Sequence, residues 1–359
     1  MNDFLIIGGG IAGVSTAARL SHLGSVTLLE RETALAYHAS GRSAALFEQS
    51  YGKPSTVALN MASRDYHMTA NGGVLSPRGL MLVAAAGQED AFAIEARDMD
   101  LTEIAPADAP QHFGLLNPAT ITRAALSDHA WDIDTDRLIQ NFAREARGNG
   151  AMILTGKEVT AITRTATGWQ VTTPTATHDA RHIVNAAGAW VDVVAALAGL
   201  APLGFTPKRR SMARIPVPAG MDPSGWVMVF ATGEAWYAKP DAGALIVSPS
   251  EEDPAEPHDA FADDMVLAEG LARFEAHVTH PVTRMLANWA GLRTFAPDRC
   301  LVIGPDPRAP TFLWCAGQGG YGFQTAPAYS ALLADLVAGR APMLDADLIA
   351  ALSPERFLS

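Results

Sequence analysis

The pattern that most constrains this chain lies in its first 30 residues. Phe4–Ile7 is a short apolar run that predicts a buried strand, and Val26–Leu29 predicts a second strand that ends at Glu30. Between them, Gly8–Gly13 has the spacing G-x-G-x-x-G and leads into a helical segment. A strand, a glycine-rich turn, a helix and a second strand form a βαβ unit. We therefore expect an α/β fold that begins with this unit.

Each part of the unit suits the binding of a dinucleotide. Gly8 permits a tight turn, Gly10 leaves room for a pyrophosphate, and Gly13 lets the helix pack closely on the sheet. The free N–H groups at the helix N-terminus attract phosphates. Glu30 follows Gly8 by roughly 20 positions, where its carboxylate can accept hydrogen bonds from ribose hydroxyls but would repel the 2′-phosphate of NADP. If the glycines served only turns, their joint spacing with the acid would be unexplained.

Composition excludes several other classes of protein. The chain has 359 residues, of which 48% are hydrophobic and 18% charged, as in a compact globular enzyme with room for two domains. A net charge of −12, with only the short basic run Lys208–Arg210, argues against nucleic-acid binding. No apolar stretch approaches the ~20 residues of a membrane span, and the first strand leaves no room for a signal peptide. Cys300 and Cys315 indicate neither a metal site nor a disulfide, so a reduced, cytoplasmic setting is expected.

Segments typical of a nucleotide-binding fold return along the chain. Phe312–Ala316 predicts a strand that enters a second glycine-rich turn, Gly317–Gly322, and a helix over Phe323–Val337. Other elements are expected as a helix at Asp134–Asn149, strands at Glu158–Thr163 and His182–Asn185, an amphipathic stretch at Val57–Ala70, extended segments at Leu80–Ala84, Trp226–Phe230 and Ala244–Val247, and a charged surface loop at Pro249–Pro257. The order predicts a mixed α/β and α+β protein, with a Rossmann-like domain interleaved with a second domain on a mainly antiparallel sheet.

Four motifs in this order give the chain a family resemblance. They are Gly8–Gly13 with Glu30, His38–Ala45, Val184–Trp190 and Gly317–Gly322, and together they resemble the D-amino-acid oxidase superfamily of FAD flavoproteins, which includes glycine and sarcosine oxidases. Three longer segments resemble the bacterial D-arginine dehydrogenases: Pro207–Ser211, Tyr237–Gly243 and Trp289–Arg293. The resemblance implies an FAD-binding domain of residues 1–45, 130–200 and 291–359, and a substrate-binding domain of residues 46–129 and 201–290.

The resemblance also implies a cofactor site for FAD. The C-terminal glycine turn would direct its helix N-terminus at the pyrimidine side of the flavin, where two-electron reduction places negative charge. No cysteine matches the attachment site of sarcosine oxidase, so non-covalent FAD is expected. The implied cofactor residues are Gly8, Gly10, Ala12, Gly13, Glu30, Arg31, Ser40, Gly41, Arg42, Ser43, Ala44, Ala45, Val159, Gly188, Gly319, Gly320, Tyr321, Gly322 and Gln324.

For the substrate, the resemblance implies an amino acid held by its carboxylate. Arg293 matches the carboxylate-binding arginine of the family, Tyr237 its partner and Arg210 a second pocket arginine. An arginine pairs both oxygens of a carboxylate through its planar fork. Hydride transfer from Cα to flavin N5 would give an imino acid that hydrolyses to 2-oxo acid and ammonia, and no general base is predicted. Further expected pocket residues are Tyr51, Leu46, Leu80, Met228, Gly320 and Gln324.

Two departures from the D-arginine dehydrogenases predict the substrate side chain. Leu80 replaces the acid that would receive a guanidinium, and Leu46 replaces a pocket histidine. The pocket is therefore expected to be apolar and to favour apolar D-amino acids. Three alternatives remain: a glycine- or sarcosine-type amine oxidase, a 2-hydroxy-acid dehydrogenase with a base such as His38, and a non-catalytic flavin subunit of an electron-transfer complex. The electron acceptor, a quinone or oxygen, stays open.

Overall fold

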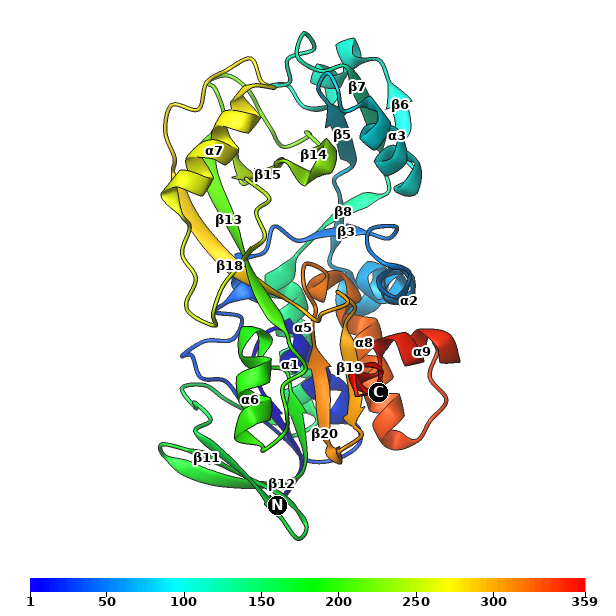
Figure 1. Cartoon of the computed structure of the whole chain (residues 1–359), viewed down its shortest axis with the longest axis vertical. Coiled ribbons are helices and arrows are strands. Elements are labelled where there is room, and N and C mark those ends of the chain that lie inside the picture. Colours follow the sequence, from blue (N-terminus) through cyan, green and yellow to red (C-terminus); the bar gives the residue numbers. More distant parts are fainter. Residues whose placement is uncertain (359) are drawn as a thin grey trace.

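Two large β-sheets organise the computed structural model, which describes residues 1–358 (Figure 1). Within these residues the first sheet has the strand order β10-β11-β12-β1-β2-β9, with β20 beside β12 and β19 beside β20. Its strands are β1 (Asn2–Ile7), β2 (Val26–Leu29), β9 (Met152–Leu154), β10 (Ala161–Thr165), β11 (Gly168–Thr173), β12 (Ala176–Asn185), β19 (Val302–Asp306) and β20 (Ala309–Ala316). The pairs β1·β12, β1·β2, β2·β9 and β12·β20 are parallel.

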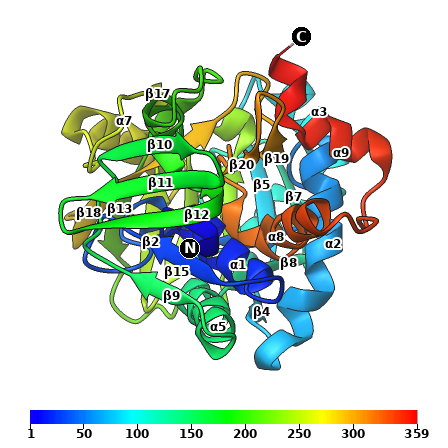
Figure 2. The same cartoon turned by 90° about the horizontal axis from the view of Figure 1, so that it is seen from below.

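Both faces of this first sheet are covered, which explains why its central strands are continuous apolar runs. Phe4 and Ile6 of β1 belong to one hydrophobic core, and Leu5 and Ile7 to another, because successive side chains point to opposite faces. The helices of the first core include α1, α5 and α8, and α1 packs against both of the others (Figure 2). The helices of the chain are α1 (Ile11–Leu20), α2 (Pro54–Thr69), α3 (Glu89–Asp98), α4 (Ala109–His112), α5 (Thr135–Gly148), α6 (Val191–Leu197), α7 (Asp264–Glu275), α8 (Gly322–Ala338) and α9 (Ala346–Leu352).

The second sheet has the order β17-β13-β16-β15-β14-β5-β7-β6, with β18 beside β13. The pair β14·β5 is parallel and the other pairs of this sheet are antiparallel, so the expected mixed fold with a mainly antiparallel second sheet is confirmed. Long strands β13 and β18 descend from this sheet toward the first (Figure 1). The strands are β5 (Leu80–Ala84), β6 (Thr102–Ile104), β7 (Arg123–Ser127), β13 (Thr206–Pro216), β14 (Met228–Ala231), β15 (Tyr237–Asp241), β16 (Ala244–Ser248), β17 (Asp253–Pro254) and β18 (Ala287–Phe295); a small third sheet holds β3 (Leu46–Glu48), β4 (Leu75–Pro77) and β8 (Ala130–Ile133).

Two local predictions were wrong in part. The strand expected at Glu158–Thr163 begins only at Ala161, where β10 starts to pair with β11. The segment Pro249–Pro257 is not wholly a surface loop. Asp253 is exposed, but the side chains of Glu251 and Glu252 turn inward, with exposed fractions of 8% and 26%. Glu251 lies beside an arginine of β13, and Glu252 lies beside arginines of β13 and β18.

A buried histidine ties the first turn of α8 to α2. His67 has no exposed surface, and its ring Nε2 lies 3.0 Å from the carbonyl oxygen of Gln324. Burial lowers the pKa of His67 to about 4, although its hydrogen bonds to the backbone of Gln324 and Phe323 oppose this shift. The neutral ring is therefore the form that packs in the folded protein.

We expect the folded state to lose stability as the pH falls from about 6.5 toward 4. The unfolded chain protonates His67 near pH 6.5 while the folded protein resists it, so the stabilisation is complete above that pH and declines below it, by about 3 kcal/mol at 1.36 kcal/mol per pH unit. Unfolding midpoints measured across this range should fall less in a His67→Gln variant. An exposed histidine, changed as His280→Gln, serves as the control, and equal losses in all three proteins would contradict the assignment.

Candidate active site

Two adjoining cavities open where the parallel strands of the first sheet end. Their volumes are 570 and 190 Å³. The smaller one adjoins the carboxyl ends of β1 and β2, at Ile7 and Leu29, which is the edge where open α/β sheets bind ligands. The two cavities meet, because they share the lining residues Gly10, Ala39, Ser40, Arg42, Ala186, Gly188, Gly291 and Leu292. An elongated ligand can thus extend through both.

The N-terminal glycines shape the junction between these cavities. Gly8 has φ +110°, and a Cβ atom at Gly13 would lie 1.8 Å from the carbonyl oxygen of Gly8, so the helix packs directly on the turn. Gly10 faces the space itself, where Ser40 stands beside it. The hydroxyl of Ser40 accepts a hydrogen bond from the Ile11 N–H at 3.0 Å. This corner therefore offers a helix N-terminus and a hydroxyl to a phosphate group.

Glu30 lines the smaller cavity and is held rigidly. Its Oε2 accepts a hydrogen bond from the Gly9 N–H at 2.6 Å, and its Oε1 accepts one from the Glu32 N–H at 2.8 Å. Each carboxylate oxygen keeps a further lone pair for a hydroxyl. Arg31 lines the same cavity, with its guanidinium 4.9 Å from the centre of the Trp190 ring.

Most of the residues expected to contact the cofactor line one of the two cavities. Three do not: Gly13, Gly41 and Tyr321. A Cβ atom at Gly41 would lie 2.3 Å from the Ala36 carbonyl oxygen, so this glycine serves packing, as Gly13 does. The residues that line a cavity are Gly8, Gly10, Ala12, Glu30, Arg31, Ser40, Arg42, Ser43, Ala44, Ala45, Val159, Gly188, Gly319, Gly320, Gly322 and Gln324.

Arg42 lines both cavities, but its guanidinium has other partners. Its Nη1 donates to the carbonyl oxygens of Ala260 and Ala290, and its Nη2 to Asp259. The side chain therefore connects the His38–Ala45 motif to the segment before α7 and to β18. This arrangement gives Arg42 a structural task in addition to any contact of its backbone with a ligand.

The second glycine turn opens on the larger cavity. Gly319 and Gly320 line it together with Gly322, the first residue of α8. Gly319 has φ +51°, and a Cβ atom there would lie 2.3 Å from the ring of Phe295. The N-termini of α1 and α8 thus face one space, and both carry free N–H groups.

Two arginines extend from neighbouring strands into the larger cavity. Arg210 of β13 is 5% exposed, and its Nε donates to the Glu251 carbonyl oxygen at 3.0 Å. Arg293 of β18 donates from Nη2 to Oε1 of Glu252 at 2.8 Å. Within residues 1–358, Nη2 of Arg210 and Nε of Arg293 are buried without a hydrogen-bond partner. Such groups are costly unless a ligand satisfies them.

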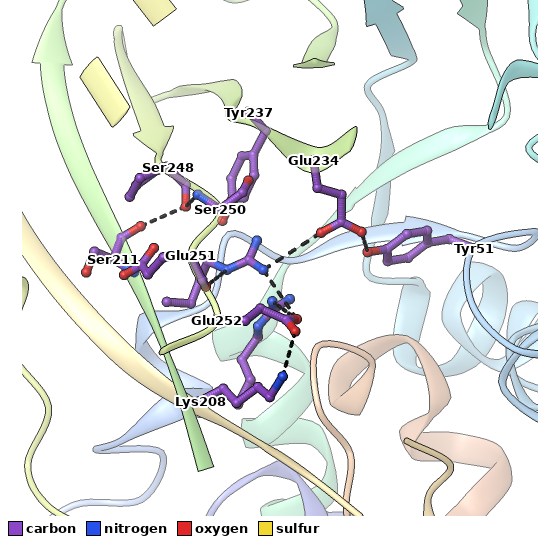
Figure 3. Close-up of polar contacts among 12 residues, drawn as sticks. Tyr51, Lys208, Ser211, Glu234, Tyr237, Ser248, Ser250, Glu251 and Glu252 are labelled. Atoms are coloured by element: carbon purple, nitrogen blue, oxygen red, sulfur yellow. Dashed lines mark hydrogen bonds and ion pairs between the residues drawn. The ribbon is translucent and has the colours of Figure 1, made fainter. Parts of the chain in front are cut away.

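Two tyrosines line this cavity, and Figure 3 shows them on either side of Glu234. Tyr237 of β15 donates its hydroxyl hydrogen to the sulfur of Met212 at 3.1 Å, and burial raises the pKa of Tyr237. Tyr51 donates to Oε1 of Glu234 at 3.0 Å, and burial and the Glu234 charge raise its pKa well above the usual range. Both phenols are therefore protonated donors at neutral pH.

The remaining wall of the cavity is largely apolar. Leu80 of β5 lies opposite Met228 of β14 in the parallel register, and Leu46 lies nearby on the cavity surface. Sequence reasoning missed Met212 and Phe230, which complete this wall. A strand periodicity of two, applied from Arg210 or from Met228, would have found both.

The sequence predicts an apolar pocket, but four carboxylates also line the larger cavity. Each has a partner within the chain, and the acids come from separate segments. Glu48 accepts from the Ser50 N–H and pairs with His129 at 2.8 Å, Glu95 accepts from the Gly233 N–H at 2.9 Å, Asp98 pairs with Arg97, and Glu234 accepts from Tyr51. Burial raises the pKa of Glu48 despite its pairing with His129.

His38 lies in the other cavity. Its Nε2 is 2.9 Å from Oε1 of Glu32, and its ring centre is 4.8 Å from that of Trp190. His38 lines the smaller cavity, whereas Arg293 and Tyr237 line the larger one. The structure does not bring His38 together with the expected substrate groups.

A strand-turn-helix cradle at the end of a parallel sheet, joined to a second helix N-terminus and two arginines on one cavity, is the arrangement expected of a dinucleotide-binding α/β oxidoreductase. The chain belongs to the DAO family of FAD-dependent oxidoreductases, whose family model matches residues 3–336.

Individual proteins are similar to the chain over nearly its whole length. The FAD-dependent oxidoreductase domain-containing protein 1 of Bos taurus is 24% identical, over 94% of this chain and 81% of that protein. Glycine oxidase from Geobacillus kaustophilus superposes with a TM-score of 0.83 at 22% identity, covering 98% of both chains. L-proline dehydrogenase from P. horikoshii superposes with a TM-score of 0.84 at 21% identity, covering 99% of this chain and 97% of that one. The expected family and the FAD cofactor are thereby confirmed.

We expect the purified protein to be yellow and to release its FAD on acid or heat treatment. The two cysteines of the chain lie outside both cavities: Cys300 follows β18, and Cys315 is fully buried against Thr16. Burial raises the pKa of Cys315 to about 12, so its thiol is a poor nucleophile. Absorbance of the supernatant after precipitation measures the release. Flavin retained by the precipitated chain would contradict non-covalent binding.

No helix within residues 1–358 combines the length and the apolar character needed to cross a membrane. The same residues contain no group of three or more His, Cys, Asp or Glu side chains placed to hold a metal ion.

Proposed function

We propose that the protein catalyses FAD-dependent oxidative deamination of D-amino acids with apolar side chains. The observation that carries this proposal is the pair Arg210 and Arg293, which line the same cavity as Tyr237 and an apolar wall and each keep one guanidinium nitrogen without a hydrogen-bond partner within residues 1–358. A carboxylate satisfies buried guanidinium groups better than any neutral ligand. The apolar wall then receives the rest of the substrate.

The chain's own residues bind and orient the amino acid. Arg293 and Arg210 hold its carboxylate, and Tyr237 donates a further hydrogen bond once its hydroxyl leaves the Met212 sulfur. The cavity residues Gly320 and Gln324, at the start of α8, delimit the space near Cα and exclude water. FAD, when bound, supplies the acceptor for the hydride. The imino acid formed from the neutral amine hydrolyses in solution to 2-oxo acid and ammonia.

The preference for apolar side chains is supported by Leu46, Leu80 and Met228. Each of the four carboxylates of the cavity accepts a hydrogen bond or an ion pair from the chain, whereas these three side chains offer no polar partner to a guanidinium. Support for the D configuration comes from the segments Tyr237–Gly243 and Trp289–Arg293, which resemble D-arginine dehydrogenases. The fold itself does not favour the D configuration, since L-proline dehydrogenase and L-amino acid deaminase share it.

Anaerobic bleaching of the flavin against a panel of substrates tests the proposal. The panel holds D- and L-amino acids, glycine, sarcosine and 2-hydroxy acids. Apolar D-amino acids should bleach the flavin fastest. Preference for glycine or sarcosine would favour an amine oxidase, bleaching by 2-hydroxy acids alone a hydroxy-acid dehydrogenase, and no bleaching at all a non-catalytic flavin subunit. Reoxidation of the bleached enzyme by oxygen or by a quinone then identifies the acceptor.

A further inference from the structure

One carboxylate of the chain, Glu252, meets four cations behind the proposed carboxylate site. Figure 3 shows Glu252 with one of them, Lys208. Oε1 of Glu252 lies 2.8 Å from Arg293 Nη2 and 3.6 Å from Arg210 Nη2. Oε2 lies 2.8 Å from Arg299 Nη1 and 3.2 Å from Lys208 Nζ. Glu252 stands on the short connection between β16 and β17, which reaches across the face of β13 and β18.

The strand register explains why an acid is needed here. Lys208 lies directly opposite Arg293 in the β13·β18 pair, and Arg210 is two positions further on the same face of β13. Like charges placed directly opposite destabilise a sheet. Burial opposes the ionisation of Glu252, but hydrogen bonds from Arg299 and Lys208 outweigh it and hold the pKa of Glu252 below its usual range. Glu252 is therefore a permanent anion in the cluster.

The same contacts limit what is left for a ligand. Arg293 and Arg210 line the larger cavity, whereas Glu252, Lys208 and Arg299 do not. Within residues 1–358, Nε of Arg293 and Nη2 of Arg210 have no hydrogen-bond partner, but Nη2 of Arg210 also lies 3.6 Å from Oε1 of Glu252 and 3.8 Å from Oε2 of Glu234. The two arginines that line the cavity can pair with one substrate carboxylate, while Lys208 and Arg299 contact Glu252 from outside the cavity.

We propose that Glu252 is a specificity-determining residue that makes the site select substrates with one carboxylate over substrates with two. This rests on the proposed function, in which Arg293 and Arg210 hold the substrate carboxylate. Glu252 takes the place of a second carboxylate among the four cations, and its charge repels a dicarboxylic amino acid more strongly than a monocarboxylic one.

The sign of the effect follows from charge alone. A Glu252→Gln change keeps the size of the side chain but adds one net positive charge beside the site. Any loss of orientation in Arg293 weakens the binding of the first carboxylate in both kinds of ligand, so it cancels in the ratio of their affinities. The added attraction for the second carboxylate does not cancel. We expect the ratio to rise on the order of tenfold, the effect of one unit charge nearby in a partly solvated site.

Binding of two non-oxidisable carboxylates to the FAD-loaded enzyme measures this ratio. Propionate carries one carboxylate and succinate two, and both are titrated at a pH where they are fully ionised, with flavin absorbance as the signal. Glu252→Gln should raise the affinity for succinate relative to propionate. Asp253→Asn is the matched control, because Asp253 is exposed and pairs with Arg209, outside both cavities, and it should leave the ratio unchanged.

A second variant tests the same charge balance in the opposite direction. Arg299 contacts Glu252 without lining either cavity, so Arg299→Gln leaves the carboxylate less neutralised and should lower the succinate-to-propionate ratio. It also provides the test if Glu252→Gln does not fold. An unchanged or inverted response in the variants that fold would overturn the role of Glu252 while leaving the proposed function intact. A wild-type enzyme that binds neither carboxylate would instead refute the proposed function.

Discussion

Replacing Arg293 by alanine is expected to leave FAD bound and to cost about 2–5 kcal/mol of transition-state stabilisation, measured as the fall in kcat/KM. Arg293 lines the larger cavity, and its buried Nε has no hydrogen-bond partner within residues 1–358. A substrate carboxylate that enters this space without Arg293 still loses its water but keeps only Arg210 as an opposite charge.

The protein should tolerate this change. Glu252, the present partner of Arg293, keeps its contacts with Arg299 and Lys208, so no unpaired charge is left buried. Arg214→Ala is a suitable control, because Arg214 lies on β13 as Arg210 does but pairs with Asp241 outside both cavities. Esters and amides of good substrates should also react poorly with the wild-type enzyme. Near-native kcat/KM in the Arg293→Ala variant would remove Arg293 from the site.

The parts of the fold that the sequence predicts well are those with local signals. The turn at Gly8–Gly13 is specified by the spacing of its glycines, four of the six positions. The helix that starts after Asp134 is specified by a side-chain cap on the Arg137 N–H together with its apolar period. The start of β10 was misplaced because Glu158 and Val159 have the composition of strand residues, whereas backbone contact with β11 begins at Thr160, whose N–H donates to the Thr172 carbonyl oxygen. Strand boundaries depend on the partner strand, which no local pattern describes.

The contacts between distant segments could not be predicted in the same way. The charged residues and prolines of Pro249–Pro257 predict a surface loop. Only the pairing of β13 with β18 shows that Glu252 faces four cations. The acids that line the larger cavity could not be predicted for the same reason. Glu48, Glu95 and Glu234 come from three segments, and nothing local relates them. The resemblance predicted that Arg210, Arg293 and Tyr237 share one cavity. It did not predict which residues of the chain each of them contacts.

The selectivity of the side-chain pocket gives the second large expected effect. Wild-type enzyme should prefer D-leucine, D-methionine or D-phenylalanine to D-arginine and D-lysine. An apolar side chain gains about 0.8 kcal/mol for each CH₂ group buried against Leu46, Leu80 and Met228, until the space is full. A cationic side chain in the same place loses hydration without gaining a dedicated partner. Steady-state kcat/KM across this series measures the preference.

A Leu80→Glu variant should shift the ratio of kcat/KM values for D-arginine and D-leucine toward D-arginine. Leu80 is 2% exposed and lies opposite Met228 on the cavity wall, so a carboxylate there stands where the substrate side chain passes. Leu80→Gln is the matched control, since it adds polarity without charge and should lower the rate with D-leucine without a comparable gain for D-arginine. We expect only a partial gain, because Leu46 and Phe230 still present apolar surface to the cation. A wild-type enzyme that oxidises D-arginine faster than every apolar D-amino acid would defeat the pocket argument, and one active on L-isomers alone would defeat the proposed configuration.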